Sequence, residues 1–416
     1  MATEASGTGT PWLNRTVAGL ALTSLLSDLG HEAQSTLLPA FLAALGAPPL
    51  ALGAIEGVSD AAASFVKLGA GRLSDRLRRR KPFVVAGYAA TGLASGIIAL
   101  AGGWPLVLTG KLFGWIGKGV RGPLRDAMLA RSIPPEARGR AFGFHRAGDT
   151  VGAILGPLLA VLLLGWGASH GHATLPWLRT VMAWTLVPGL GAATVMAWSV
   201  RETLADGSPR AGAEHLHHAP GAFRRYLSAV GVFGAGDYAH TLLILAAAQL
   251  LAPAHGVARA AVWGAGLYVW HNAIYALAAF PAGALADRFG HRRILALGYG
   301  VSVAVPLLLV GAFLRGAASL PLMALVFALA GLVNGVQDTL EGSAVAGFVP
   351  ESERGFGYGL LGAVNGGGDL VSSLLVGGLW TLWPTLGFGY AAVMMAIGAG
   401  LMAREGLRPG PQPAGA

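Results

Sequence analysis

The sequence predicts an all-α polytopic membrane protein whose twelve helices form two pseudo-symmetric six-helix bundles. Hydrophobic residues make up 54% of the 416 residues, and charged residues make up only 12%. Many of the apolar stretches exceed the roughly 20 residues that a helix needs to cross the hydrocarbon of a bilayer. Motifs between these stretches occur twice, once in each half of the chain. In membrane proteins, such paired halves indicate alternating access around a site between them.

Three motifs carry the repeat. The letters GRLSDR at residues 71–76 return as GALADR at 283–288, in both cases between two apolar runs. The letters PPEARG at 134–139 return as PESERG at 350–355. An aspartate followed three residues later by a histidine opens each half, at 28–31 and at 237–240. The three offsets are closely similar, so the chain consists of two homologous halves.

The apolar stretches predict twelve membrane spans. Taken in order, they lie near residues 17–45, 51–73, 82–101, 104–131, 139–167, 175–200, 223–251, 259–286, 293–315, 318–346, 355–384 and 385–404. Several exceed one bilayer thickness and must tilt or protrude. The stretch between the sixth and seventh spans is polar and contains Pro and Gly. We therefore expect a bundle over 1–200, a cytoplasmic linker over 201–222 and a second bundle over 223–416.

Loop charge predicts the orientation. Basic residues concentrate in the loops of one side, at 76–81, 138–140, 201–225, 288–293, 354 and 404–408. The loops of the opposite side carry little beyond Arg259 and Arg315. Because basic loops stay in the cytoplasm, both termini are expected there. Residues 1–11 lack the charged region and cleavage site of a signal peptide. The expected location is a bacterial-type inner (plasma) membrane.

The doubled loop motif resembles the signature loop of the major facilitator superfamily, and the resemblance covers nearly the whole chain. The first copy has Arg78 where that family commonly has Gly, whereas the second copy keeps Gly290. The aspartates could hold a neighbouring helix end through charge-assisted hydrogen bonds that break when the halves rock. Alternatively, the basic cluster only sets topology. The gating residues that the resemblance implies are Gly71, Asp75, Arg76, Arg80, Gly283, Asp287, Arg288 and Arg292.

The fifth span is similar to the antiporter motif of that family, which is associated with exporters. The matching positions are Gly143, Gly152, Gly156 and Pro157. The trailing glycines of the family pattern are absent, because Ala160 and Val161 follow. Small residues permit close contact between helices in a membrane. The alternative is generic glycine packing in a chain with 64 glycines.

A narrower resemblance concerns residues 117–126 and the letters DLGHE at 28–32. Together they resemble a subgroup of these permeases that includes nickel-resistance exporters. The resemblance implies a proton-coupled exporter of a small solute, with a divalent transition-metal cation such as nickel or cobalt as the first expectation. The alternative is efflux of multiple drugs or other small organic molecules by proton antiport.

Ionisable residues within the first and seventh spans predict the central site. Asp28, His31 and Glu32 share one helix face by their spacing, and Asp237 and His240 repeat the pattern. Such residues are costly in hydrocarbon and should face a cavity or a partner. We expect these five to bind substrate or protons. Imidazoles and carboxylates suit a divalent ion, held by Asp28, His31, Asp237 and His240, or a proton relay. They could also merely hydrogen-bond one another.

Further polar residues are secondary candidates for the cavity. They are Asp60, Arg121, Asp126, His145, Arg146, Asp149, His271, Asp338, Glu341 and Asp369.

Other function classes fail on specific residues. After His31-Glu32 a zinc-protease helix needs a second histidine, but position 35 is Ser. Residues 112–119 lack the first Gly and the Ser or Thr of a nucleotide-binding P-loop. The chain has no cysteine, so a thiolate metal site is excluded. We expect no enzyme activity and no cofactor. The expected partners are the solute, protons and the lipid bilayer, without nucleic acid, and the protein is expected to be monomeric.

Overall fold

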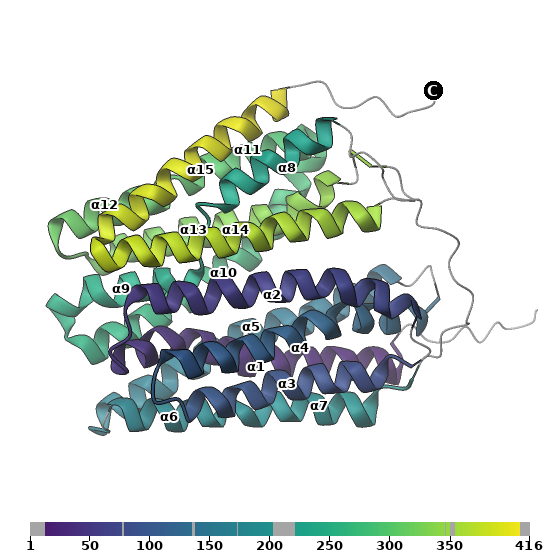
Figure 1. Ribbon diagram of the computed structural model, residues 1–416, viewed down its shortest axis with the longest axis horizontal. Coiled ribbons are helices and arrows are strands. Elements are labelled where there is room, and N and C mark those ends of the chain that lie inside the picture. Colours follow the sequence, from purple (N-terminus) through teal and green to yellow (C-terminus); the bar gives the residue numbers. More distant parts are fainter. Residues whose placement is uncertain are drawn as a thin grey trace, which may run out of the picture.

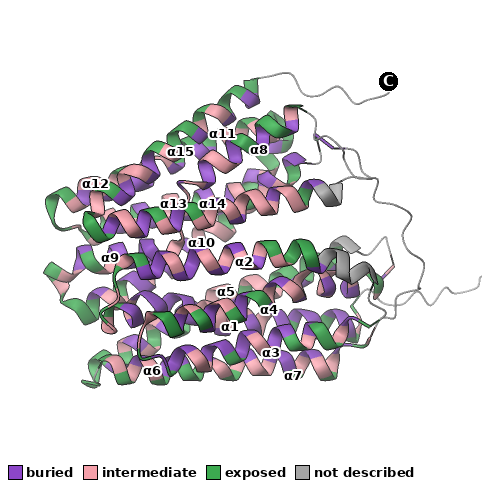
Figure 2. Ribbon diagram, in the orientation of Figure 1, coloured by how far each residue is buried: buried purple, intermediate pink, exposed green. Residues whose placement is uncertain are grey.

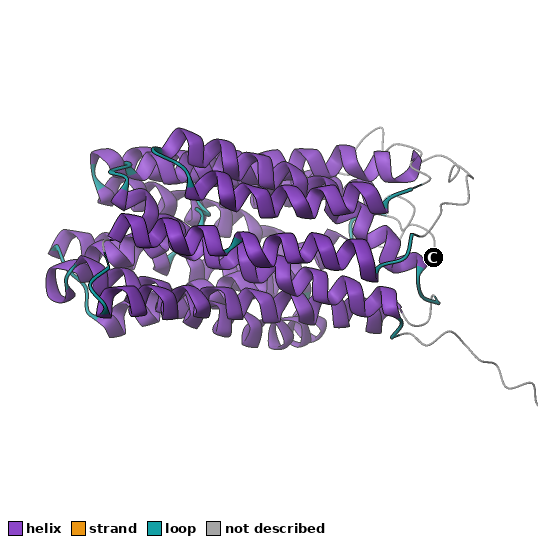
Figure 3. Cartoon of the chain, turned by 90° about the horizontal axis from the view of Figure 1, so that it is seen from below, coloured by secondary structure: helices purple, strands orange, loops and turns teal. Residues whose placement is uncertain are grey.

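The computed structural model describes residues 13–76, 79–134, 138–172, 174–202, 221–345, 347–349 and 354–407. Side chains of residues 71–76, 138–139 and 354–356 lie outside this description. The described residues form helices and no strand (Figure 3). The helices of the first half are α1 (Arg15–Ala44), α2 (Pro49–Arg76), α3 (Lys81–Ala99), α4 (Trp104–Arg131), α5 (Arg138–Ser169), α6 (Thr174–Trp184) and α7 (Leu186–Ser199). Those of the second half are α8 (Gly221–Gly234), α9 (His240–His255), α10 (Val257–Phe289), α11 (His291–Ser302), α12 (Ala304–Arg315), α13 (Leu320–Val345), α14 (Arg354–Leu382) and α15 (Pro384–Leu407).

These helices make twelve spans in two groups, α1–α7 and α8–α15, which lie one above the other in Figure 1. The predicted all-α fold is confirmed. Seven of the described spans are long and apolar enough to cross a membrane by length and composition alone. Charged residues inside α1, α2 and α4 lower the hydropathy of those helices. Such residues are tolerated where they face the bundle interior.

Three of the spans are interrupted, which the sequence did not predict. The pairs α6/α7, α8/α9 and α11/α12 each form one span with a break. In the seventh span the break covers residues 235–239, so Asp237 lies outside any helix. Two serines of α14 bind the backbone freed by this break: Ser372 Oγ donates to the Asp237 carbonyl at 2.8 Å, and Ser373 Oγ accepts from the Ala239 N–H at 3.2 Å. Irregular backbone at membrane depth requires such partners.

The hydrophobic core is shared between the halves at one end only. At the end away from the termini, a single cluster joins Leu38 and Phe41 of α1 to Leu242 of α9 and Val376 of α14. Towards the termini, each half has its own cluster. Figure 2 shows that buried residues occur along the helices of both halves. The halves therefore pack together at the far end and keep separate cores at the terminal end.

Candidate functional site

Two adjoining cavities lie between the halves. The first, which we call the acidic cavity, has a volume of about 510 Å³ and is lined by Glu56, Asp60, Asp237, Asp338 and Asp369, with Lys118 as the one Lys or Arg among its lining residues. The second, the mixed cavity, has a volume of about 440 Å³ and is lined by Asp28, Glu32, Asp149 and Asp338 together with Lys67, Lys118, Arg121, Arg125 and Arg146. The cavities share Lys118, His240, His271, Asn334 and Asp338. Both volumes suit a small ligand.

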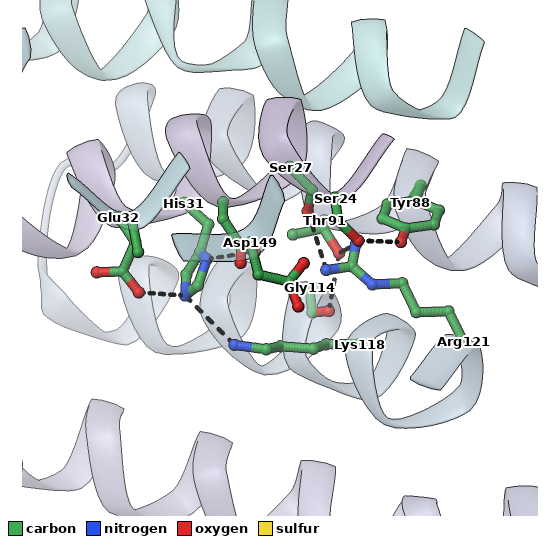
Figure 4. Close-up of polar contacts among 12 residues, drawn as sticks. Ser24, Ser27, His31, Glu32, Tyr88, Thr91, Gly114, Lys118, Arg121 and Asp149 are labelled. Carbon is green, nitrogen blue, oxygen red and sulfur yellow. Dashed lines mark hydrogen bonds and ion pairs between the residues drawn. The ribbon is translucent and has the colours of Figure 1, made fainter. Parts of the chain in front are cut away.

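The predicted face of α1 points into the mixed cavity. His31 lies between two carboxylates, with its Nδ1 3.6 Å from Asp28 and its Nε2 3.5 Å from Glu32 (Figure 4). Lys118 Nζ of α4 approaches the same Nε2 at 3.3 Å. The edge of the His31 ring also meets Trp115, with 5.2 Å between ring centroids. The imidazole therefore lies among two carboxylates, one ammonium group and one indole ring.

Glycines of α5 hold α1 in this position. A Cβ on Gly152 would lie 2.5 Å from the Leu25 carbonyl oxygen, and one on Gly156 would lie 2.7 Å from that of Leu29. Gly148, which the sequence analysis overlooked, meets α1 in the same way one turn earlier. The spacing of four residues between Gly148, Gly152 and Gly156 was the signal in the sequence that could have identified it. Gly143, by contrast, has no neighbour within 4 Å of such a Cβ, and Pro157 lies within α5.

Asp237 and His240 do not repeat the geometry of Asp28 and His31. Asp237 lies in the break before α9 and lines the acidic cavity, whereas His240 begins α9 and reaches both cavities. The His240 ring stacks on Tyr268 of α10, at 4.6 Å between centroids and 6° between planes, and its buried Nε2 has no hydrogen-bond partner. Tyr268 OH donates to Glu32 at 3.0 Å. This hydrogen bond connects the two halves.

The arrangement does not favour the metal set expected from the sequence. Among the described residues, no group of three or more His, Cys, Asp or Glu side chains is placed to hold a metal ion. The physical reason is the break at residues 235–239, which separates Asp237 from the face that carries Asp28 and His31.

A buried ion pair lies beside the central site, and the sequence analysis did not find it. Lys111 Nζ of α4 lies 2.5 Å from Glu56 of α2, and the two side chains are 1% and 3% exposed. Lys111 and Lys118 lie over the Trp115 ring, at 4.5 and 4.9 Å from its centroid. The indole Nε1 of Trp115 donates to Asp60 at 2.6 Å. On α2, Glu56 and Asp60 are four residues apart, and on α4, Lys111, Trp115 and Lys118 are four and three residues apart. Such spacings place each set on one helix face, and this was the signal that the sequence offered.

Secondary candidates of the first half form a second network. Arg121 is buried; its nitrogens donate to Thr91 at 3.1 Å and to Ser27 at 2.9 Å (Figure 4). His145 binds Ser24 at 2.9 Å and lies 3.6 Å from Asp149. Arg146 also lies near Asp149, at 3.8 Å. Asp126 lies 3.0 Å from Arg125. Asp126 and His145 are not among the lining residues of the two cavities.

In the second half, Glu341 is buried behind the acidic cavity. It accepts hydrogen bonds from Tyr299 at 2.5 Å and from Asn365 at 2.7 Å. His271 lies between Asn272 and Asn334, at 3.0 and 3.3 Å. The two other candidates line the acidic cavity, Asp338 with a hydrogen bond of 2.8 Å from Tyr275, and Asp369 on α14.

The gating residues are described only in part. The side chains of Gly71, Asp75 and Arg76 lie outside the described residues, and the Arg80 N–H donates to Glu202 at 3.0 Å. In the second copy, Asp287 is 79% exposed and lies 3.7 Å from His291. Arg292 stacks over Phe348 at 5.5 Å, Arg288 lies over Phe289 at 5.2 Å, and a Cβ on Gly283 would lie 3.7 Å from Thr339.

Comparisons with known proteins agree with this architecture. The sequence model of the Major Facilitator Superfamily matches residues 20–253 and 227–415. The chain belongs to this superfamily. It is 28% identical over 394 residues to an uncharacterized MFS-type transporter of Methanocaldococcus jannaschii, covering 94% of each chain. It is 30% identical over 383 residues to an uncharacterized protein of Mycobacterium tuberculosis, covering 89% of this chain and 87% of the relative.

Solved structures share the fold. A bacterial homologue of the human lysosomal transporter Spinster, inward-facing and occupied, aligns with a TM-score of 0.75 at 17% identity, covering 95% of this chain and 97% of the other. A mutant of the nucleoside transporter NupG aligns with a TM-score of 0.75 at 12% identity, covering 94% and 98%. This major facilitator protein is therefore a multi-pass membrane transporter.

Proposed function

We propose that the protein is a proton-coupled antiporter that exports a small organic solute carrying a cationic group. The observation that carries the proposal is the acidic cavity, where Lys118 is the one Lys or Arg of the lining. Of its five lining carboxylates, Glu56 is paired with Lys111, and the other four form no ion pair among the described residues. A desolvated carboxylate without a counter-charge is costly, and a cationic solute would offset that cost. Export is supported by the glycine packing of α5 on α1, since it resembles the antiporter motif.

Proton coupling is supported by the groups around His31. Asp28, Glu32 and Lys118 all contact this imidazole, and Asp, Glu and His side chains form proton relays in membrane transporters. A proton that enters the mixed cavity can therefore compete with the cation for the carboxylates. The expected coupling residue is Asp28, and Asp28→Asn is expected to let solute cross without proton movement.

The divalent metal expected from the sequence is the second candidate. It is supported by the three histidines that line the cavities, His31, His240 and His271, but the described residues hold no cluster of three donors. An organic cation needs no such cluster, because it is bound by charge and shape rather than by coordination. The organic solute is therefore our first proposal.

Proteoliposomes with an acidic lumen and a trapped pH dye would test both candidates. Organic cations of graded size, or Ni²⁺ and Co²⁺, are added outside. We expect organic cations to raise the lumenal pH as protons leave, and Asp237→Asn to reduce this response at least tenfold. Arg315→Ala, at an exposed helix end remote from both cavities, is the matched control. A response to metal alone, lost in His31→Ala and His240→Ala, would instead establish the metal exporter.

A further inference from the structure

The central cavity is divided by charge, and this division points to a solute with two opposite charges. We infer that the transported solute is amphoteric, with its cationic group in the acidic cavity near Asp237 and Asp369 and its anionic group at Lys118 and Lys67. The inference rests on the proposed function and specifies the substrate class of the same site.

At the acidic end, Glu56 is the one lining carboxylate with an ion pair among the described residues. Among the ion pairs of the described residues, none involves Asp237 or Asp369. Asp60 receives only the neutral indole N–H of Trp115. Two buried polar atoms beside them also lack partners: the hydroxyl of Tyr238, whose residue is 9% exposed, and the amide oxygen of Gln337. Both residues line the acidic cavity. An ammonium group has donors for these acceptors as well as charge for the carboxylates.

At the basic end, two lysines have no carboxylate partner among the described residues. Of the cationic residues lining the mixed cavity, Arg125 and Arg146 have carboxylate partners within the protein. Arg121 is 3% exposed and donates to two hydroxyls. Lys67 and Lys118, by contrast, form no ion pair with any described carboxylate. Lys118 contacts His31 and the Trp115 ring, and Lys67 is exposed and lines the mixed cavity. A carboxylate, sulfonate or phosphate on the solute would supply the missing partner.

Trp115 lies between a carboxylate and a lysine of the two ends. Its indole N–H binds Asp60 on the acidic side, and Lys118 lies 4.9 Å above its ring centroid and lines both cavities. Because Lys118 lines both cavities, a small solute can contact the acidic end and Lys118 at the same time. A solute with only a positive charge would lie beside Lys118 without compensation.

Matched sets of probes in the same proteoliposome assay would test the inference. Each set contains a free amino acid or dipeptide, its methyl ester, which keeps only the cation, and its N-acetyl derivative, which keeps only the anion. The scaffolds are β-alanine, phenylalanine and alanyl-phenylalanine. We expect at least one zwitterion to drive proton movement at a tenfold or more lower concentration than its two single-charge analogues.

Substitutions in the site would show which residues bind the anionic group of the solute and which bind its cationic group. Lys118→Met should weaken the zwitterion at least tenfold more than it weakens the ester. Asp369→Asn should weaken the zwitterion to the level of the N-acetyl form. Lys67→Ala repeats the first test should Lys118→Met fail to fold, and Arg315→Ala is again the control. Thermal stabilisation of each purified variant by the zwitterion provides a second readout that does not depend on transport.

The outcomes separate this inference from the proposed function. Esters or other organic cations that match every zwitterion, with no effect of Lys118→Met, would overturn the amphoteric solute and leave the cation antiporter intact. A failure of all organic probes, charged in either way, would overturn both.

Discussion

At the scale of single residues, the structure places opposite charges in close contact where the sequence shows only isolated ones. Glu56 and Lys111 are far apart along the chain, and each alone would be prohibitively costly at membrane depth. Sequence reasoning could identify Asp28, His31 and Glu32 as one face, because their spacing is local. It could not pair Lys111 with Glu56 or Tyr268 with Glu32, because these contacts depend on how different helices pack.

The buried pair gives a quantitative prediction. Lys111→Met leaves Glu56 buried without a counter-charge, which costs about 3–5 kcal/mol. We expect a large drop in the melting temperature of the purified protein. Lys111→Met combined with Glu56→Gln removes both charges and should recover most of that loss. Equal destabilisation by the single and double variants, measured by thermal unfolding in detergent, would show that the pair contributes through packing alone.

At the scale of helices, the twelve predicted stretches correspond to helices of the structure, and seven of these spans are long and apolar enough to cross a membrane. The breaks inside three of the twelve were missed. The break before α9 follows Gly234 and contains Gly236, but the chain has 64 glycines, so these two carry little signal. Its backbone is satisfied by Ser372 and Ser373, more than a hundred residues away. A local pattern cannot report a partner that distant in sequence.

The contact between α1 and α5 is the second prediction. Gly152→Ala would place a methyl group 2.5 Å from the Leu25 carbonyl oxygen. The helices must separate, at a cost of about 1–3 kcal/mol, and Asp28 would move with α1. We expect lower thermal stability together with a loss of transport of tenfold or more. Gly165→Ala on the same helix is the control, because a Cβ at position 165 would have no neighbouring atom within 4 Å. Similar effects of the two substitutions would argue against a special role for this contact.

At the scale of the whole molecule, the two halves share a core only at the end away from the termini. Alternating access requires the opposite arrangement as well, in which that shared core separates and the terminal ends meet. The Tyr268–Glu32 hydrogen bond joins the halves in the present arrangement. Asp287 is exposed beside His291 and forms no ion pair with a described residue of the opposite half. If Asp287 is a latch, we expect it to act in the other arrangement.

Removing the Tyr268–Glu32 hydrogen bond and removing the Asp287 latch should therefore shift the conformational balance in opposite directions. Tyr268→Phe removes a hydrogen bond to a carboxylate, worth about 1.5–3 kcal/mol, and should favour opening of the far end. Asp287→Asn weakens the latch and should favour the present arrangement. Because the chain has no cysteine, spin labels can be attached through Pro48→Cys and Val257→Cys, two exposed positions at the far end of opposite halves. Tyr268→Phe should lengthen the mean distance between the labels, and Asp287→Asn should shorten it or leave only the short population. A lengthening in both variants would rule out a latch at Asp287, because removing it would then favour the state it was meant to stabilise.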